Sequence, residues 1–200
     1  MNSVERMYTS DPVAFAGAYL AYVQSILKGI NTAEIGRFVT TLLEARAKGA
    51  TIFFIGNGGS AATASHFAND LAIGCRDSEL PFRAISLADN MSMITAIAND
   101  FGYEDVFARQ LRVLAKSGDV LVAISASGNS PNLLKAFEQA TALGLKTIAI
   151  TAFDGGEMRK IADEGIHVPT QLKEYGPAED AHMVLDHLVT TYLMRCVRIG

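Results

Sequence analysis

Short runs of apolar residues recur along the chain and predict the strands of a sheet. The runs at 52–55, 119–124 and 146–151 are rich in β-branched and other apolar side chains, which is typical of buried strands. A run at 81–87 predicts a further strand, and 166–169 predicts a short edge strand because it ends in proline. Since the strongest runs do not alternate with polar residues, the pattern predicts a parallel sheet with helices on both faces.

Helical periodicity lies between these runs and before the first of them. Asp11 and Pro12 form an N-cap and a first-turn proline for a helix over 11–29, and 31–34 resembles a capping box that opens a second helix ended by Gly49. We expect these two helices to cover the sheet or, alternatively, to form a helical dimer interface. Later helices are expected at 61–71, 91–98, 106–115, 131–142, 157–162 and 177–197.

Length and composition favour one domain over 1–200, with N-terminal helices at 1–48 and an α/β core at 51–200. The net charge of −4 argues against a surface that coats nucleic acid, and no apolar run approaches the roughly 18 residues of a membrane helix. The chain start lacks the features of a signal peptide, and Cys75 and Cys196 lack metal-like spacing, so we expect free thiols and a cytoplasmic protein. Because 50% of the residues are hydrophobic and only 19% are charged, we also expect subunit contacts.

A glycine-rich turn at 56–60 follows the first strand and leads into a helix. Its glycines allow a close approach of the backbone, and the helix start offers free N–H groups and a positive dipole end, both of which favour phosphate. The alternatives are a plain tight turn and a dinucleotide site of the G-x-G-x-x-A type. The nucleotide alternative is weaker, because the expected acidic residue arrives late, at Asp89.

A second polar loop follows the strand at 119–124. It places Ser125, Ser127 and Ser130 beside another helix start, and Ser130 alone would be explained by capping of that helix. Hydroxyls and backbone N–H groups suit the several oxygens of a phosphate. Because the carboxyl ends of parallel strands meet at one edge of the sheet, the two loops together favour a phosphorylated ligand.

Candidate acid–base groups lie on two helices. His66 and Asp70 are spaced to leave the same face of one helix. The last helix carries Glu179, Asp180, His182, Asp186 and His187, and spacing alone does not choose among them. Acids in a first helical turn often only complement the dipole, and a lone helical histidine is more often structural than catalytic.

Several separated motifs closely resemble the sugar isomerase (SIS) domain family and, within it, the phosphoheptose isomerases. The residues that carry this resemblance are 56–62, 65–67, 95–100, 107–110 and 124–132. The resemblance implies a three-layer α/β sandwich around a five-stranded parallel, flavodoxin-like sheet, assembled as a homotetramer with sites between subunits. It also implies conversion of sedoheptulose 7-phosphate to D-glycero-D-manno-heptose 7-phosphate through an enediol, for the heptose of cell-envelope glycans such as lipopolysaccharide.

The resemblance further implies a bound zinc ion and a set of site residues. The implied metal ligands are His66, Asp70, Glu179 and His187. The implied substrate contacts are Asn57, Gly58, Gly59, Ser60, Asn99, Asp100, Ser125, Ala126, Ser127, Ser130 and Glu179. Asp70 is expected to act as the catalytic base and His187 as its acid/base partner.

This sequence departs from the family pattern at three positions. The family has glutamate where Asp70 stands, glutamine where Glu179 stands and threonine where Ala126 stands. One alternative function is therefore a non-catalytic SIS protein that binds a sugar phosphate or regulates a replication initiator. Retention of His66, His187 and a carboxylate at position 70 favours the enzyme over this alternative. A third alternative, a dinucleotide-binding oxidoreductase, is disfavoured by the late acidic residue and by the serine loop.

Overall fold

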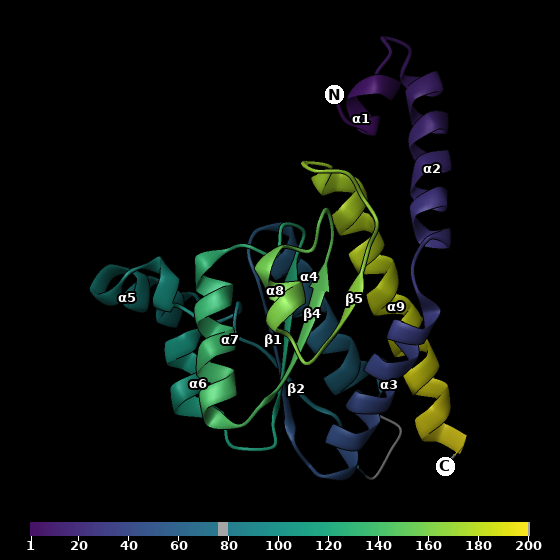
Figure 1. The fold of residues 1–200 in the computed structure, drawn as a ribbon. Coiled ribbons are helices and arrows are strands. Elements are labelled where there is room, and N and C mark those ends of the chain that lie inside the picture. The colour runs from purple at the N-terminus through teal and green to yellow at the C-terminus, as the bar shows by residue number, and fades with distance from the viewer. Residues whose placement is uncertain (76–79, 200) are drawn as a thin grey trace.

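A five-stranded parallel sheet forms the centre of the molecule, in the order β2-β1-β3-β4-β5 (Figure 1). The computed structural model describes residues 1–75 and 80–199. The strands are β1 Thr51–Gly56, β2 Arg83–Ser86, β3 Val120–Ser125, β4 Lys146–Thr151 and β5 Glu164–His167. This order is that of a flavodoxin-like sheet, so the predicted fold class is confirmed.

Helices cover both faces of the sheet, as the apolar strands require (Figure 1). The α-helices within the described residues are α1 Ser3–Met7, α2 Pro12–Lys28, α3 Thr32–Ala47, α4 Gly59–Asn69, α5 Met91–Phe101, α6 Ala108–Leu114, α7 Pro131–Leu143, α8 Gly156–Ile161 and α9 Tyr175–Ile199. A π-helical turn, η1 Asp70–Gly74, continues α4, and a 3₁₀ turn, η2 Tyr103–Asp105, precedes α6.

Alternate residues of β1 divide between two hydrophobic cores. Ile52 and Phe54 pack with side chains of α3, α4 and α9 on one face. Phe53 and Ile55 pack with side chains of α6, α7 and α8 on the other. All four side chains are fully buried, and this period of two is what a strand between two helical layers produces.

The predicted elements are found, with shifts at several ends. The helix expected to stop before Asn99 continues to Phe101 and ends at Gly102, whose φ of 98° terminates it. The helix expected from 106 begins instead at Ala108, after the 3₁₀ turn. The last helix begins two residues before Pro177, because proline is tolerated in a first helical turn.

The two N-terminal helices have different surroundings. α3 packs against β1 and β5, whereas α2 extends away from the sheet and makes its main contacts with α9 and α1 (Figure 1). The expectation that both helices cover the sheet is therefore wrong for α2, where Ile26 is the only side chain of the helix that is buried. Val13 and Leu20 are 79% and 70% exposed on its surface.

The predicted capping box at the start of α3 is only half formed. Asn31 accepts a hydrogen bond from the Ala33 backbone, as an N-cap does. The Glu34 carboxylate instead accepts the backbone N–H of His167 at 3.0 Å and so ties α3 to the edge strand β5. Among the described residues no single helix is long and apolar enough to cross a membrane; α2 and α3 together meet that test but are bent by 68°.

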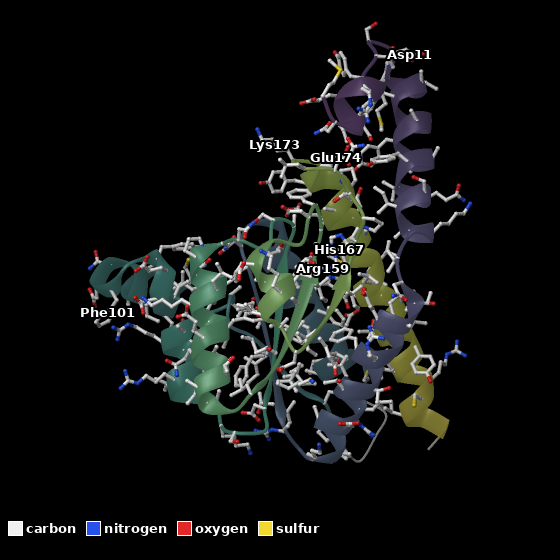
Figure 2. The ribbon with its side chains drawn as sticks, in the orientation of Figure 1. Asp11, Phe101, Arg159, His167, Lys173 and Glu174 are labelled. Atoms are coloured by element: carbon white, nitrogen blue, oxygen red, sulfur yellow. The ribbon has the colours of Figure 1, made fainter. Side chains whose placement is uncertain are left out.

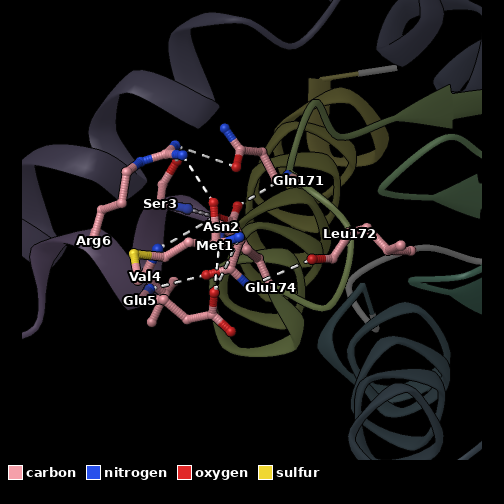
Figure 3. Close-up of polar contacts among 9 residues, drawn as sticks. All are labelled: Met1, Asn2, Ser3, Val4, Glu5, Arg6, Gln171, Leu172 and Glu174. Atoms are coloured by element: carbon pink, nitrogen blue, oxygen red, sulfur yellow. Dashed lines mark hydrogen bonds and ion pairs between the residues drawn. The ribbon is translucent and has the colours of Figure 1, made fainter.

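Glu174 anchors the N-terminal segment to the loop before α9 (Figures 2 and 3). Its buried carboxylate accepts the backbone N–H of Ser3 at 2.6 Å, the hydroxyl of Tyr22 at 2.5 Å and the backbone N–H of Gln171 at 2.9 Å. Burial raises the pKa of Glu174, but these hydrogen bonds to the ionised form outweigh burial and leave the pKa below its ordinary value.

We expect Glu174→Gln to lower the free energy of unfolding by about 1–3 kcal/mol at neutral pH, because it leaves buried donors without an ionised acceptor. The pKa of Glu174 is lower in the folded state, so the stabilisation is complete above the ordinary value of 4.5 and is lost as the pH falls through the folded pKa. Urea unfolding at several pH values should therefore show a difference from wild type that shrinks in acid. The exposed Glu138→Gln on α7 is the control, and an equal effect of both variants would contradict the anchoring role.

Candidate functional site

Two loops meet where β1 and β3 end, at the carboxyl edge of the sheet. Gly56, the last residue of β1, lies beside Ile124 near the end of β3. The side-chain amides of Asn57 and Asn132 form a reciprocal pair, with N–O distances of 2.9 and 2.8 Å, that joins the loops. The Tyr103 hydroxyl also donates to the Asn57 oxygen at 2.9 Å, so the first loop is fixed from two sides.

Glycine is required at several positions of the first loop. A Cβ at Gly56 would lie 2.4 Å from the backbone oxygen of Ser60, and that oxygen belongs to the turn itself. Gly58 has a φ of 54°, which side chains rarely adopt. A Cβ at Gly59 would lie 2.2 Å from the Glu179 carboxylate, so α9 approaches the start of α4 closely at this point.

A small pocket of about 130 Å³ lies between the two loops and α9. Most of the predicted substrate-contact residues line it. They are Asn57, Ser60, Ser125, Ala126, Ser127, Ser130 and Glu179, and Tyr175 joins them. The predicted residues Asn99 and Asp100 lie elsewhere, exposed near the end of α5, where the Asn99 amide donates to the Asp100 carboxylate at 2.8 Å.

The serine hydroxyls of the second loop are suited to donate to an anion. Ser125 Oγ accepts the backbone N–H of Gly128 at 3.1 Å, which leaves its own O–H to donate. Ser130 occupies the N-cap position of α7, but its side chain makes no capping hydrogen bond. Helix capping therefore does not account for this hydroxyl, and the start of α7 adds further N–H donors.

A larger cleft lies at the opposite edge of the sheet. It has a volume of about 890 Å³ and is lined by α3 and by the segments that lead into β3, β4 and β5. Ligands of parallel α/β sheets bind at the carboxyl ends of the strands, where helix starts point toward them. The position of the smaller pocket at the carboxyl edge and its serine hydroxyls therefore favour it as the ligand site.

His66, Asp70 and His187 come together where α4 packs against α9. The Nε2 atoms of His66 and His187 are 3.2 Å apart, and His66 Nε2 lies 3.5 Å from Asp70 Oδ2. Asp70 is the first residue of the π-helical turn η1, a distortion that is frequent at functional sites. The His66 and Asp70 side chains are 43% and 21% exposed, so this cluster is open to small molecules.

Asp186 lies beside this cluster and was only one of several helix acids in the sequence interpretation. Its side chain is fully buried, and neither carboxylate oxygen has a hydrogen-bond partner within the described residues. Burial, with a smaller contribution from the negative charge of Asp70, raises the pKa of Asp186 to about 7. Helical spacing could have indicated this burial, because Asp186 lies on the apolar stripe of α9, one turn after His182 and three residues before Val189.

The two other buried or half-buried histidines are held neutral. Burial lowers the pKa of His182 to about 4, an effect that the nearby Thr151 backbone offsets only partly. Burial and the positive charge of Arg159 lower the pKa of His167, which lies at the end of β5 (Figure 2). We assign neither residue a catalytic role.

Four side chains can hold a metal ion at the α4–α9 contact. One ligand atom from each of His66, Asp70, Asp186 and His187 lies within 4.8 Å of the others. Ligands of a tetrahedral zinc ion, with bonds of about 2.0–2.1 Å, lie roughly 3.3 Å apart, close to the spacing of the two histidine nitrogens. Imidazole and carboxylate are also a donor set that zinc accepts. Glu179, a predicted ligand, is outside this group, and its role stays a prediction.

Comparison with known proteins identifies relatives over most of the chain. The model of the SIS domain family matches residues 18–152. A phosphoheptose isomerase of Helicobacter pylori (strain P12) is 37% identical over 179 residues, which are 88% of this chain and 92% of the relative. A probable phosphoheptose isomerase of Thermoplasma acidophilum is 39% identical over 160 residues, or 80% of this chain and 87% of the relative. The solved phosphoheptose isomerase of Neisseria gonorrhoeae superimposes with a TM-score of 0.80 at 31% identity, covering 90% of this chain and 96% of that one.

We expect Gly56→Ala to lower the free energy of unfolding by about 1–3 kcal/mol, because its Cβ overlaps the backbone of the turn. Gly36→Ala in α3 is the control: nothing lies within 4 Å of its Cβ, so it should stabilise the protein by about 0.5–1 kcal/mol. Urea unfolding of both variants measures the difference. A neutral Gly56→Ala would show that the turn tolerates a side chain.

Proposed function

The chain belongs to the SIS domain family, and from this premise we propose that it is a phosphoheptose isomerase. The proposed reaction converts sedoheptulose 7-phosphate to D-glycero-D-manno-heptose 7-phosphate through an enediol. The convergence of His66, Asp70 and His187, about two helical turns from a pocket of serine hydroxyls, carries this proposal. The similarity to phosphoheptose isomerases over 88% of the chain supports it.

The phosphate end of the substrate is proposed to bind between the two loops. Ser125, Ser127 and Ser130 donate their hydroxyls, and the starts of α4 and α7 add backbone N–H groups. From Gly59 to His66 is about two helical turns, or roughly 10 Å. This separation suits an extended seven-carbon sugar, with its phosphate at the loops and its carbonyl end at the histidines.

Proton transfer is proposed to occur at the carbonyl end. The reaction moves a proton between neighbouring carbons, so it needs a base beside the carbon and an acid at the oxygen. Asp70 is the base, because its carboxylate is partly exposed and its Oδ2 lies near His66. His187 is the acid/base partner at the oxygen. A zinc ion held at this cluster would supply polarisation of the carbonyl oxygen.

The clustering of His66, Asp70 and His187 favours an enzyme over a non-catalytic sugar-phosphate binder or a regulator of a replication initiator. Such a protein needs the fold and the phosphate loops but has no use for an imidazole pair within 3.2 Å beside a carboxylate. A dinucleotide-dependent oxidoreductase is disfavoured by the three serines of the second loop, since hydroxyls at that place suit a terminal phosphate.

The proposal includes the setting in which the enzyme works. We propose one SIS domain over residues 1–200, one zinc ion per subunit, a homotetramer and a cytoplasmic location, with the product entering heptose synthesis for lipopolysaccharide. The exposed apolar side chains of α2 support assembly, since α2 covers little of the sheet. No disulfide involves Cys75 or Cys196 within the described residues, which accords with a reducing compartment. Neither nucleic acid nor a membrane is among the proposed partners.

Incubation of the purified protein with sedoheptulose 7-phosphate, with and without added zinc, tests the proposed activity through the appearance of an aldose. Asp70→Asn should abolish turnover while phosphate binding stays largely intact, because the phosphate loops are unchanged. Glu44→Gln, in the cleft at the opposite edge of the sheet, is the control and should keep the wild-type rate. No turnover by wild type under either condition would remove the enzyme function, and full activity of Asp70→Asn would remove Asp70 as the base.

We expect Ser127→Ala to raise KM about 10-fold with little change in kcat, since a hydrogen bond to a charged group contributes about 1.5–3 kcal/mol and neighbouring donors compensate in part. The phosphate is distant from the reacting carbons, so the protein's contacts to it affect substrate binding more than the rate of proton transfer. Steady-state kinetics over a range of substrate concentrations measures the two constants. An unchanged KM would show that the second loop does not hold the phosphate.

A further inference from the structure

Asp186 is a buried carboxyl group that nothing in the described part of the molecule satisfies. It is fully buried, and among the described residues neither of its oxygens has a hydrogen-bond donor. A buried carboxylate without a partner is strongly unfavourable, so such groups in proteins are paired with a cation or coordinate a metal. The imidazoles of His66 and His187 are the nearest candidates to share that metal with it.

The other carboxylates near the cluster have different surroundings. Asp70 is partly exposed and already has neighbours, because the Asn69 amide donates to it at 3.3 Å and His66 Nε2 lies 3.5 Å away. Glu179 lies against Gly59 at the start of α4 and lines the phosphate pocket. On α9 it precedes His187 by more than two turns, or about 12 Å along the axis. A single ion is therefore poorly placed to contact both residues of one chain.

We propose that Asp186 is the permanent carboxylate ligand of a divalent metal ion held with His66 and His187, and that Asp70 remains free to carry the proton. Two histidines and one carboxylate are the ligand set of catalytic zinc sites that keep a position open for substrate. This assignment separates two roles that the family resemblance places on the carboxylate at position 70. The assignment of Asp70 rests on the proposed isomerase function, whereas the assignment of Asp186 does not.

The shortened side chain at position 70 fits this division of roles. Aspartate lacks one methylene of the family's glutamate, and it stands here beside an additional, buried carboxylate on the facing helix. The ion is then held from the buried side by Asp186, while Asp70 faces the solvent side from which a sugar enters. Glu179 is left to contact the sugar phosphate at the loops.

Metal binding by the full chain tests the proposal without reference to turnover. Protein freed of metal with a chelator is titrated with Co²⁺, whose visible absorption reports ligand geometry, and with Zn²⁺ in a calorimeter. Asp186→Asn should weaken binding of both ions at least about 100-fold, beyond the 10–100-fold typical of residues that only support a ligand. Glu179→Gln, an equal change of charge on the same helix, should bind both ions as wild type does. Asp70→Asn should stay within about 10-fold of wild type.

Thermal unfolding supplies a second readout that separates a ligand from a structural residue. Without metal, Asp186→Asn and Asp186→Ala should melt at or above the wild-type temperature, because they remove a buried carboxyl group that has no hydrogen-bond partner among the described residues. Both variants should lose the rise in Tm that zinc gives wild type. A residue that only supports the fold would instead lower the Tm of the metal-free protein.

Each outcome decides the assignment. Wild-type Co²⁺ affinity and absorption in Asp186→Asn would overturn it, and so would an equal or larger loss of affinity in Glu179→Gln, including through Glu179 of a second copy. A loss in Asp70→Asn as large as that in Asp186→Asn would place Asp70 among the permanent ligands and overturn the division of roles. If wild type binds metal through Asp186 but fails to isomerise the heptose phosphate, the metal assignment stands and the proposed function fails.

Discussion

The packing of α9 against α4 is the contact on which the candidate site depends. It brings His187 and Asp186 of one helix to His66 and Asp70 at the end of the other. Two turns away, the same pair of helices places the Glu179 carboxylate only 2.2 Å from the position that a Cβ of residue 59 would take. One interface therefore positions both the histidine–aspartate cluster and one wall of the pocket between the two loops.

The sheet and its loops were predictable because their causes are local. Unbroken apolar runs such as 52–55 can be buried on two faces only in a parallel sheet between helices, and both hydrophobic cores show this. The glycines at 56 and 58 are required by the turn itself, through a backbone contact and a positive φ. The pairing of Asn57 with Asn132 follows from two strands ending at one edge.

The remaining features depend on contacts between distant segments, which periodicity does not encode. α2 has the apolar spacing of a covering helix, yet it extends away from the sheet, since α3 and α9 already occupy that face. In the sequence, Asp186 could not be distinguished from the other acidic residues of the last helix. In the structure it is buried, and it has no hydrogen-bond partner among the described residues. The change from α- to π-helix at Asp70 is not encoded in the apolar periodicity of the sequence.

Glu174 and α9 also connect the N-terminal segment to the helix that carries His187. The 25-residue α9 begins directly after Glu174, receives a hydrogen bond from Tyr19 of α2 through Asp180, and carries His187 in its middle. Deleting the residues before α3 would therefore remove the hydrogen bonds of Ser3, Tyr19 and Tyr22 that hold the beginning of the helix on which His187 lies.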